Sequence, residues 1–352
     1  MTKAKSLKCV IWDLDHTIWD GVLSEGGDVR LRDGVPRVLQ TLDARGVLHS
    51  IASRNHFADA QAKLTALGLW DYFLYPQIHW DTKVQSIEAI ARQLNLGLDA
   101  MAFIDDDPFE RAAVAFALPQ VTCIDAAELA TLLDLPALMP RFITEDSRLR
   151  RQMYRDDAQR KQIEHDWQGS DEELLATLGM KFHIALAREA DLQRAEELTV
   201  RTNQLNSTGV TYSYEELDRL RRSPHHALWI ASLEDRFGKM GRIGLALVER
   251  DPDAWTLRLL LMSCRVMSRG VGSLLLNFVI GQAQRAGVAL RADFIANDRN
   301  RVMGVTYGFA GLKQIGERDG IQILELARPI PQPVPAYVEL TVEDHVHQQP
   351  GE

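Results

Sequence analysis

The 352-residue chain is poor in cysteine, in excess positive charge and in long apolar runs, and each shortage excludes a class of protein. Its three cysteines, Cys9, Cys123 and Cys264, lie far apart, which disfavours a disulfide framework or a zinc cluster. Its 40 basic residues are outnumbered by 49 acidic ones, so we expect no nucleic-acid partner. No apolar run approaches the roughly 18 residues of a membrane span, and the first residues lack a signal-peptide pattern. We therefore expect a cytoplasmic protein without membrane contact.

The remaining composition, with 46% hydrophobic residues, is that of an ordered globular chain. Its length predicts two or three domains at roughly 150 residues each. Up to residue 135, short apolar runs alternate with amphipathic segments, which predicts a parallel sheet with helices on both faces. The predicted strands are 9–14, 47–52, 101–104 and 121–124, and the predicted helices are 36–44, 57–67, 83–94 and 109–116. In such sheets the functional residues lie at the carboxyl ends of the strands.

Beyond residue 135 the pattern changes twice. A stretch of mixed charge with few apolar positions predicts a solvent-exposed helix that joins two domains. Three apolar stretches with short turns between them, 227–233, 241–248 and 255–262, then predict an antiparallel meander in a second α/β domain. We expect the following boundaries: a first domain over 1–140, a charged helical linker over 141–170, a second domain over 171–330 and a poorly ordered tail over 331–352.

The strongest chemical signal is V-I-W-D-L-D-H-T at residues 10–17, where an apolar strand ends in Asp13 and Asp15. Two carboxylates held close together attract a hard cation such as Mg²⁺. They can also divide the work, one as a nucleophile on phosphorus and the other as acid and base. Taken alone, the pair is better explained as an acidic loop after a buried strand.

Three further groups follow in order at the ends of predicted elements: Ser53 with Arg54 and Asn55, then Lys83, then Asp105 with Asp106. The serine suits a hydrogen bond to a phosphoryl oxygen, the lysine suits neutralisation of charge, and the two acids suit completion of a magnesium site. Each has a structural alternative as a turn serine, a surface lysine, or acids that cap the helix after Pro108. Together they supply the parts of a phosphoryl-transfer site.

In this set of motifs the chain resembles the haloacid dehalogenase superfamily of aspartate-nucleophile phosphotransferases. The resemblance implies a Rossmann-like domain and a phosphorylated Asp13 intermediate, with Asp15 as acid and base. It further implies phosphate contacts from Ser53, Arg54, Asn55 and Lys83, and Mg²⁺ held by Asp13, the backbone of Asp15, Asp105 and Asp106. No large cap domain fits between the motifs, so we expect an open site.

The second domain contains L-M-S-C-R-V-M-S-R-G-V-G at 261–272, a strand that leads through a glycine turn into an apolar helix. Backbone N–H groups at such a helix start can approach a phosphate, although a ligand-free turn fits equally well. Together with T-Y-G-F-A-G at 306–311, this stretch resembles Gcn5-type acyltransferases, which bind coenzyme A. Met267 departs from the polar residue usual there. Cys264 beside Arg265 is a candidate nucleophile, because a nearby cation lowers a thiol pKa; a small buried hydrophobe is the alternative.

Over roughly residues 8–328 both halves resemble the FkbH-like proteins of polyketide biosynthesis. The stretches that carry this are D-L-D-H-T-I-W-D-G-V, F-I-D-D-D-P-F-E-R, T-N-Q-L-N-S-T, E-D-R-F-G-K-M-G and L-M-S-C-R-V-M-S-R-G-V. The resemblance implies that 1,3-bisphosphoglycerate loses a phosphate and that its glyceryl group passes to the phosphopantetheine thiol of an acyl carrier protein. It implies a pantetheine and acyl site made by Asn203, Asn206, Arg265, Arg269, Gly270, Gly272 and Tyr307. Asp20 and Asp107 depart from residues common in that family.

Two other functions remain open from the sequence. The chain would act as a stand-alone phosphatase if the second domain were only a non-catalytic lid. It would act as a scaffold if neither domain were catalytic, but a scaffold has no need of the acid, serine and lysine set. Within the first hypothesis, direct attack by pantetheine without Cys264 is the alternative to a covalent glyceryl enzyme.

Overall fold

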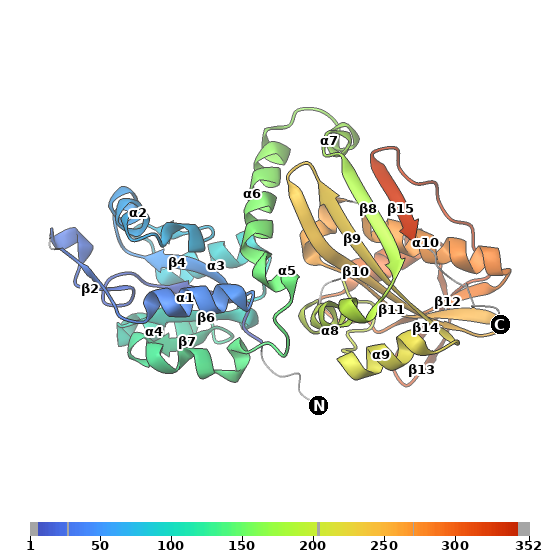
Figure 1. Ribbon diagram of the computed structural model, residues 1–352, viewed down its shortest axis with the longest axis horizontal. Coiled ribbons are helices and arrows are strands. Elements are labelled where there is room, and N and C mark those ends of the chain that lie inside the picture. The colour runs from blue at the N-terminus through green and yellow to red at the C-terminus, as the bar shows by residue number, and fades with distance from the viewer. Residues whose placement is uncertain (1–5, 27, 203–204, 270, 344–352) are drawn as a thin grey trace, which may run out of the picture. The chain divides into compact units, whose positions relative to one another are not determined.

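The computed structural model describes residues 6–26, 28–202, 205–269 and 271–343, except for the side chains of 264, 267 and 268. The chain forms two compact units, Met1–Ala158 and Gln159–Glu352 (Figure 1). Among the described residues, no helix is long and apolar enough to cross a membrane.

The first unit is built on a parallel five-stranded sheet with the order β5-β4-β1-β6-β7. Central β1 is buried throughout and pairs in parallel with β4 and β6, Cys9 lying opposite Leu48 and Met101. All five strands therefore point their carboxyl ends to one edge. The strands are β1 (Cys9–Trp12), β4 (Leu48–Ser53), β5 (Gln77–Ile78), β6 (Met101–Asp105) and β7 (Thr122–Asp125).

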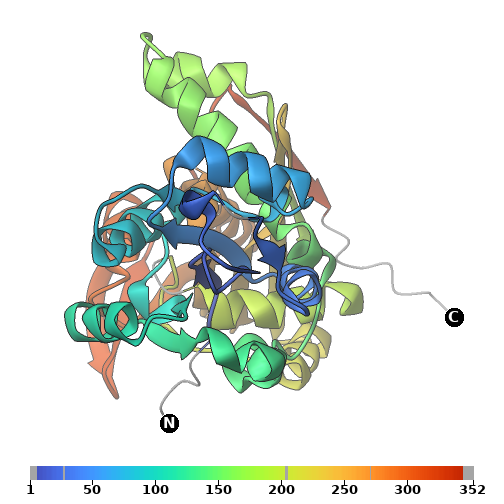
Figure 2. The ribbon, with the colours of Figure 1, turned by 90° about the vertical axis from the view of Figure 1, so that its left-hand side faces the viewer.

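Helices cover both faces of this sheet (Figures 1 and 2) because successive strand side chains point to opposite sides. Val10 and Trp12 pack with apolar residues of α1 and α2, whereas Cys9 and Ile11 pack with those of α3 and α4. The helices are α1 (Val35–Ala44), α2 (Phe57–Ala66), α3 (Lys83–Leu94) and α4 (Pro108–Ala117), and short 3-10 turns are η2 (Trp70–Tyr72), η3 (Leu98–Ala100), η4 (Ala126–Asp134) and η5 (Pro136–Leu138).

Only a small excursion separates β1 from α1. It consists of β2 (Trp19–Asp20), η1 (Leu23–Glu25) and β3 (Arg30–Leu31), with β2 and β3 paired antiparallel. No large cap domain is inserted among the described residues of this excursion or between β4 and α3.

The charged segment after residue 141 forms α5 (Glu145–Arg148) and α6 (Arg150–Asp166). In the first unit, Arg151 Nε lies 2.8 Å from Asp43 Oδ1. In the second unit, Arg160 is only 2% exposed, and its Nε and Nη2 donate to the two Asp235 oxygens at 2.7 and 2.8 Å. The prediction of a solvated helix is wrong here, because a guanidinium paired through two hydrogen bonds can be buried.

The second unit contains an eight-stranded mixed sheet with the order β13-β14-β12-β11-β10-β9-β8-β15. The predicted meander is present as antiparallel β9, β10 and β11, whereas β11 and β12 run parallel. The strands are β8 (Met180–Leu186), β9 (His226–Asp235), β10 (Gly238–Arg250), β11 (Ala254–Met262), β12 (Ala289–Phe294), β13 (Lys313–Arg318), β14 (Ile321–Leu326) and β15 (Val338–Glu343).

Alternation of side chains again divides the core by face. Trp229 and Ala231 of β9 pack with apolar residues of α10, while Leu228 and Ile230 pack with those of α8 and α9. The helices of this unit are α7 (Asp171–Thr177), α8 (Leu192–Arg201), α9 (Tyr214–Arg222), α10 (Val271–Ala286) and α11 (Arg301–Phe309), with η6 (Glu189–Asp191) and η7 (Cys264–Arg269).

Part of the tail is ordered, contrary to prediction. Val338–Glu343 forms β15, which pairs in parallel with β8 from Val338 opposite Met180 to Glu343 opposite Ala185. The ladder satisfies backbone groups that local sequence cannot reveal, because the partner strand is distant in the chain. The rest of that prediction, residues 344–352, lies outside the described residues.

Candidate active site

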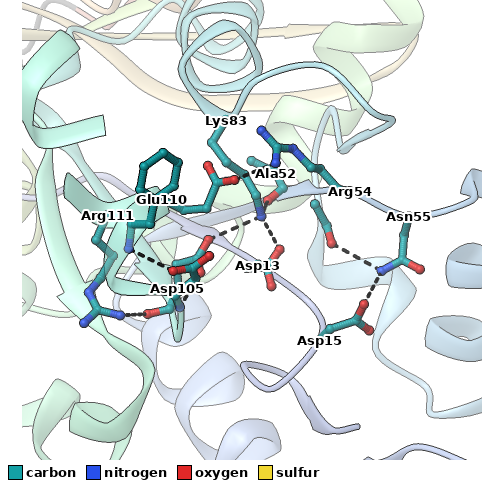
Figure 3. Close-up of polar contacts among 12 residues, drawn as sticks. Asp13, Asp15, Ala52, Arg54, Asn55, Lys83, Asp105, Glu110 and Arg111 are labelled. Carbon is teal, nitrogen blue, oxygen red and sulfur yellow. Dashed lines mark hydrogen bonds and ion pairs between the residues drawn. The ribbon is translucent and has the colours of Figure 1, made fainter. Parts of the chain in front are cut away.

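Lys83 lies at the centre of the carboxyl edge of the parallel sheet (Figure 3). Its ammonium donates a short hydrogen bond to Asp13 Oδ1 and a 2.7 Å bond to the Ala52 carbonyl. It also lies 3.3 Å from Asp105 Oδ2. The lysine is only 4% exposed, so it joins the ends of β1, β4 and β6 as a buried cation rather than as a surface charge.

Local sequence explains why Lys83 points into the site. It is the first residue of α3, which begins with a capping box formed by Thr82 and Gln85. This cap sets the start of the helix, and the apolar residues Ile87, Ile90 and Leu94 bind α3 to the sheet. The lysine is therefore held over the strand ends by a helix whose position depends on the core.

Two acids share this one ammonium. Burial and, after it, the charge of Asp13 raise the pKa of Asp105 against the opposing effect of Lys83, and the result is a pKa of about 7. Burial also raises the pKa of Asp13, with Lys83 lowering it in part. Ionised carboxylates in so buried a place need more positive charge than one lysine supplies.

The acidic cluster fits a divalent cation. Asp13, Asp105 and Asp106 offer carboxylate oxygens that all lie within 4.8 Å of one another. Asp105 Oδ2 is buried and, among the described residues, accepts no hydrogen bond. Hard oxygen ligands, a buried carboxylate oxygen without a hydrogen bond and an excess of negative charge all favour Mg²⁺. Helix capping, the alternative explanation for these acids, falls to Asp107, whose Oδ1 accepts from Phe109 N at 2.8 Å.

Asp15 lies beside this cluster, but its carboxylate is bound by other groups. Oδ1 accepts from Trp19 Nε1 at 2.8 Å and from the Leu23 backbone N–H at 3.1 Å. Oδ2 accepts from Asn55 Nδ2 at 2.9 Å, and that amide also lies 3.5 Å from Ser53 Oγ (Figure 3). Asn55 therefore connects the predicted acid with the predicted phosphate donor.

Arg54 lies at the rim of the same site. Its guanidinium is 2.8 Å from Glu110 Oε1 of α4, and its side chain is 43% exposed, whereas that of Glu110 is 11% exposed. A partly exposed guanidinium held by a buried carboxylate presents its remaining donors to an anion that enters the site. The structure thus brings together all the residues that the sequence predicts for phosphate and metal: Asp13, Asp15, Ser53, Arg54, Asn55, Lys83, Asp105 and Asp106.

Sequence reasoning missed Trp19. The indole is fully buried, yet its N–H points at a site carboxylate. The available signal was a tryptophan four residues after Asp15, since a buried indole N–H requires an acceptor nearby.

The residues expected to form an acyl site are largely occupied within the second unit. Asn206 is buried; its Oδ1 accepts from Thr208 N and Gly209 N, and its Nδ2 donates to the Thr202 carbonyl. Arg265 Nη2 donates to the Met240 carbonyl, and buried Arg269 lies 3.4 Å from Glu164 Oε1. Gly272 lies in α10 and Tyr307 is fully buried in α11. Asn203, Gly270 and the Cys264 side chain lie outside the described residues.

A segment of the chain fills the place where β11 and β12 separate. These strands pair only from Ala254 opposite Ala289 to Leu257 opposite Ala292. Beyond that point Ser207 N donates to the Leu260 carbonyl at 2.9 Å, and Met262 N donates to the Leu205 carbonyl at 2.8 Å. Ile295 N in turn donates to the Ser207 carbonyl at 3.0 Å. An extended ligand arm could pair with this part of β11 only by displacing residues 205–207.

Buried acids around a lysine, at the carboxyl edge of a capless parallel sheet, define an aspartate-based, magnesium-dependent phosphatase of the haloacid dehalogenase type. Human magnesium-dependent phosphatase 1 is 30% identical to the chain over 140 residues, which are 34% of this chain and 78% of the human protein. The chain belongs to the magnesium-dependent phosphatase 1 family, and Mg²⁺ is its cofactor. No protein-family model matches the chain.

Solved structures resemble separate parts of the chain. The N-terminal part of BF1531 from Bacteroides fragilis, which contains a phosphatase domain complexed with Mg, is 29% identical over 38% of this chain and 40% of that chain, with a TM-score of 0.35. The ribosomal-protein-S18-alanine N-acetyltransferase of Escherichia coli is 16% identical over 43% of this chain and 96% of that chain, with a TM-score of 0.34. The predicted architecture, a parallel α/β sheet followed by a second α/β unit, is present in the structure.

Proposed function

We propose that the chain hydrolyses a phosphate monoester through a phosphorylated Asp13. The observation that supports this most directly is Asp13 beside the buried Lys83 ammonium and within the acidic cluster. An Asp13 oxygen forms a bond to phosphorus while the bond from phosphorus to the leaving oxygen breaks, and Asp15 protonates that oxygen. Water then attacks the phosphoaspartate and gives its proton to Asp15, which releases phosphate and restores both acids. Lys83, Ser53 and Arg54 bind the phosphoryl oxygens.

Asp13, the Asp15 backbone, Asp105 and Asp106 would hold Mg²⁺, which would neutralise charge on the phosphoryl group. Lys83 holds Asp13 in place and favours its ionised form, because the ammonium opposes the effect by which burial raises the pKa of Asp13. The site is open, with Arg54 at its rim, which suits a substrate that carries a second acidic group.

The test of this step is Asp13→Asn. The variant keeps the size of the side chain but removes the nucleophile, so we expect phosphate release to fall about 10⁴-fold or more. Acid-quenched intact mass should show a phosphate adduct on the wild-type chain that the variant lacks. Asp28→Asn, which changes an exposed partner of Lys63, is the matched control and should leave release unchanged. Unchanged release by Asp13→Asn would remove the core of this proposal.

For the complete reaction we propose that 1,3-bisphosphoglycerate is the substrate and an acyl carrier protein is the acceptor. The acyl phosphate reacts with a thiol, so that a carbon–sulfur bond forms as the carbon–oxygen bond to phosphate breaks, and the Asp13 site hydrolyses the remaining monoester. Cys264 accepts the glyceryl group first and passes it to the carrier pantetheine. The motifs shared with FkbH-like proteins support this proposal, together with the acetyltransferase-like unit in the same chain.

One observation favours the second candidate, a stand-alone phosphatase with a non-catalytic second unit. The polar groups of Asn206 and Ser207 are engaged within the protein rather than presented to a ligand. Incubation with 1,3-bisphosphoglycerate, Mg²⁺ and a panel of holo carrier proteins, read by intact mass, separates the two. Glyceryl on a carrier supports the transfer reaction, whereas phosphate release with every carrier unmodified supports the second candidate. Glyceryl transfer by Cys264→Ala would exclude the covalent step at that cysteine.

A further inference from the structure

Trp19 is a buried donor that the phosphatase motifs do not include. It is fully buried, and its Nε1 donates to Asp15 Oδ1 at 2.8 Å. The ring packs in the apolar cluster that contains Ile18, Val29 and Leu39. Its position is therefore set by the core of the first unit and not by the carboxylate that it contacts.

A tight turn after Asp15 brings the indole back to that acid. The backbone N–H groups of Thr17, Ile18 and Trp19 all point to the Leu14 carbonyl, at 3.2, 2.8 and 3.3 Å. His16 has a φ of 53°, a left-handed conformation that allows the chain to reverse. Pairing of Trp19 with Leu31 between β2 and β3 then anchors the returning chain. Few degrees of freedom remain between the indole and Asp15.

The hydrogen bonds make the two oxygens of Asp15 inequivalent. A carboxylate oxygen has two lone pairs, and both on Oδ1 are used, by Trp19 Nε1 and the Leu23 N–H. Oδ2 accepts only from Asn55 among the described residues, and Asn55 also lies near Ser53 Oγ (Figure 3). The oxygen with spare capacity is thus the one directed toward the predicted phosphate donor.

We infer that Trp19 is a positioning residue that makes Asp15 Oδ2 the proton-transferring atom. This inference rests on the proposed function. Oδ2 carries the proton that passes to the leaving oxygen as the phosphorus–oxygen bond breaks. The same oxygen takes a proton from water as phosphate leaves Asp13. The indole N–H keeps Oδ1 out of this exchange and fixes the rotamer of Asp15.

The test uses two substrates that differ in their need for an acid. A nitrophenolate leaves without a proton, whereas an alkoxide needs one. Trp19→Phe keeps an aromatic ring in the core and removes the N–H. We expect its kcat/KM to fall about 10²-fold for an alkyl phosphate such as glycerol phosphate and to change less than about threefold for p-nitrophenyl phosphate. Trp19→Tyr provides the same comparison if Trp19→Phe fails to fold.

The matched control is Trp12→Phe, which removes another fully buried indole N–H, the one that donates to His49 Nδ1 at 3.1 Å. It should affect both substrates by the same factor. A second measurement combines Trp19→Phe with Asp15→Asn, where the tryptophan change should add no further loss. Equal losses for the two substrates with Trp19→Phe would overturn the positioning role. Failure of the wild-type chain to hydrolyse either substrate would instead count against the proposed phosphatase chemistry.

Discussion

The carboxyl edge of the parallel sheet and the gap between β11 and β12 both bury polar side chains, but they use them differently. At the sheet edge Asp13 and Asp105 share one ammonium, and Asp105 Oδ2 accepts no hydrogen bond among the described residues. In the gap, Asn206 and Asn300 direct their amides to nearby backbone groups. Buried polar groups with completed bonds stabilise a fold, whereas incomplete ones indicate a missing ligand.

One buried polar group near the gap lacks a hydrogen bond among the described residues. Tyr307 is fully buried near the gap, and its hydroxyl has no hydrogen-bond partner among the described residues. Burial raises the pKa of this hydroxyl, so it stays protonated at neutral pH. The Tyr307 hydroxyl can therefore still form a hydrogen bond, whereas the side-chain amides of Asn206 and Asn300 already have partners.

The largest effect on stability should come from Lys83→Met. The change leaves Asp13 and Asp105 buried without their cation, which costs about 3–5 kcal/mol of local unfolding free energy. Hydrogen exchange in peptides that cover β1 and β6 measures this, and Mg²⁺ should restore more stability to the variant than to wild type. Lys63→Met, which removes a surface ion pair with Asp28, should cost at most about 1 kcal/mol. Equal protection in Lys83→Met and wild type without Mg²⁺ would contradict the interpretation.

The second-largest loss of stability is expected in the gap between β11 and β12. Asn300 Nδ2 donates to the carbonyls of Ile295 and Asn206 at 2.9 and 3.0 Å, so Asn300→Ala leaves buried acceptors unsatisfied. We expect a loss of about 2–3 kcal/mol in exchange protection of β11 and β12, with phosphatase kcat unchanged. Asn277→Ala, on a half-buried asparagine whose Oδ1 accepts from the Gln332 N–H at the surface, is the control and should change little. A large loss of phosphatase activity with Asn300→Ala would show that the two regions are not independent.

A third prediction concerns a buried polar group of the first unit that is not part of the site. Burial lowers the pKa of His49, the Leu39 carbonyl opposes this and Arg151 adds to it, and the result is a pKa of about 3. In the unfolded chain His49 has a pKa of about 6.5. Below that pH the unfolded state takes up a proton that the folded state does not, so the free energy of unfolding falls as the pH drops from about 6.5 toward 3. Between pH 7 and 5 wild type should lose about 2 kcal/mol more than His49→Gln. The free energy of unfolding is measured in urea at each pH. The same pH dependence in wild type and in His49→Gln would refute this prediction.

The smallest effect should come from the surface. Arg155 Nη2 lies 2.7 Å from Asp71 Oδ1, and this contact lowers the pKa of Asp71, but the aspartate side chain is 73% exposed. Arg155→Ala should therefore cost at most about 1 kcal/mol, and less at high salt. Urea unfolding at two salt concentrations measures it. If Arg155→Ala lowered the free energy of unfolding as much as Lys83→Met does, burial would not be what separates the strong ion pairs of this protein from the weak ones.

Periodicity predicted the regular parts of the fold well. The helix expected over 83–94 is α3, and the three expected meander strands are β9, β10 and β11. The site residues were also predictable, because each follows a strand or begins a helix and parallel strands bring those ends together.

Long-range pairings were not predictable. Arg160 and Asp235 are 75 residues apart, and neither has a local pattern that indicates burial. The contact of Trp19 with Asp15 depends on a left-handed residue at His16, which only Gly, Asn or Asp would have suggested. The insertion of residues 205–207 beside β11 depends on how far β11 and β12 diverge, a property of the assembled sheet.

The last strand also determines how the chain can be shortened. β15 covers one side of β8, whose residues Phe182 and Ile184 are fully buried. A chain that ended at Pro335 would expose a row of unpaired N–H and carbonyl groups along β8, and such an edge can recruit a strand from another molecule. The outer strand carries Glu339 and Glu343, charges that discourage further pairing. The six residues of β15 therefore protect the second unit against self-association.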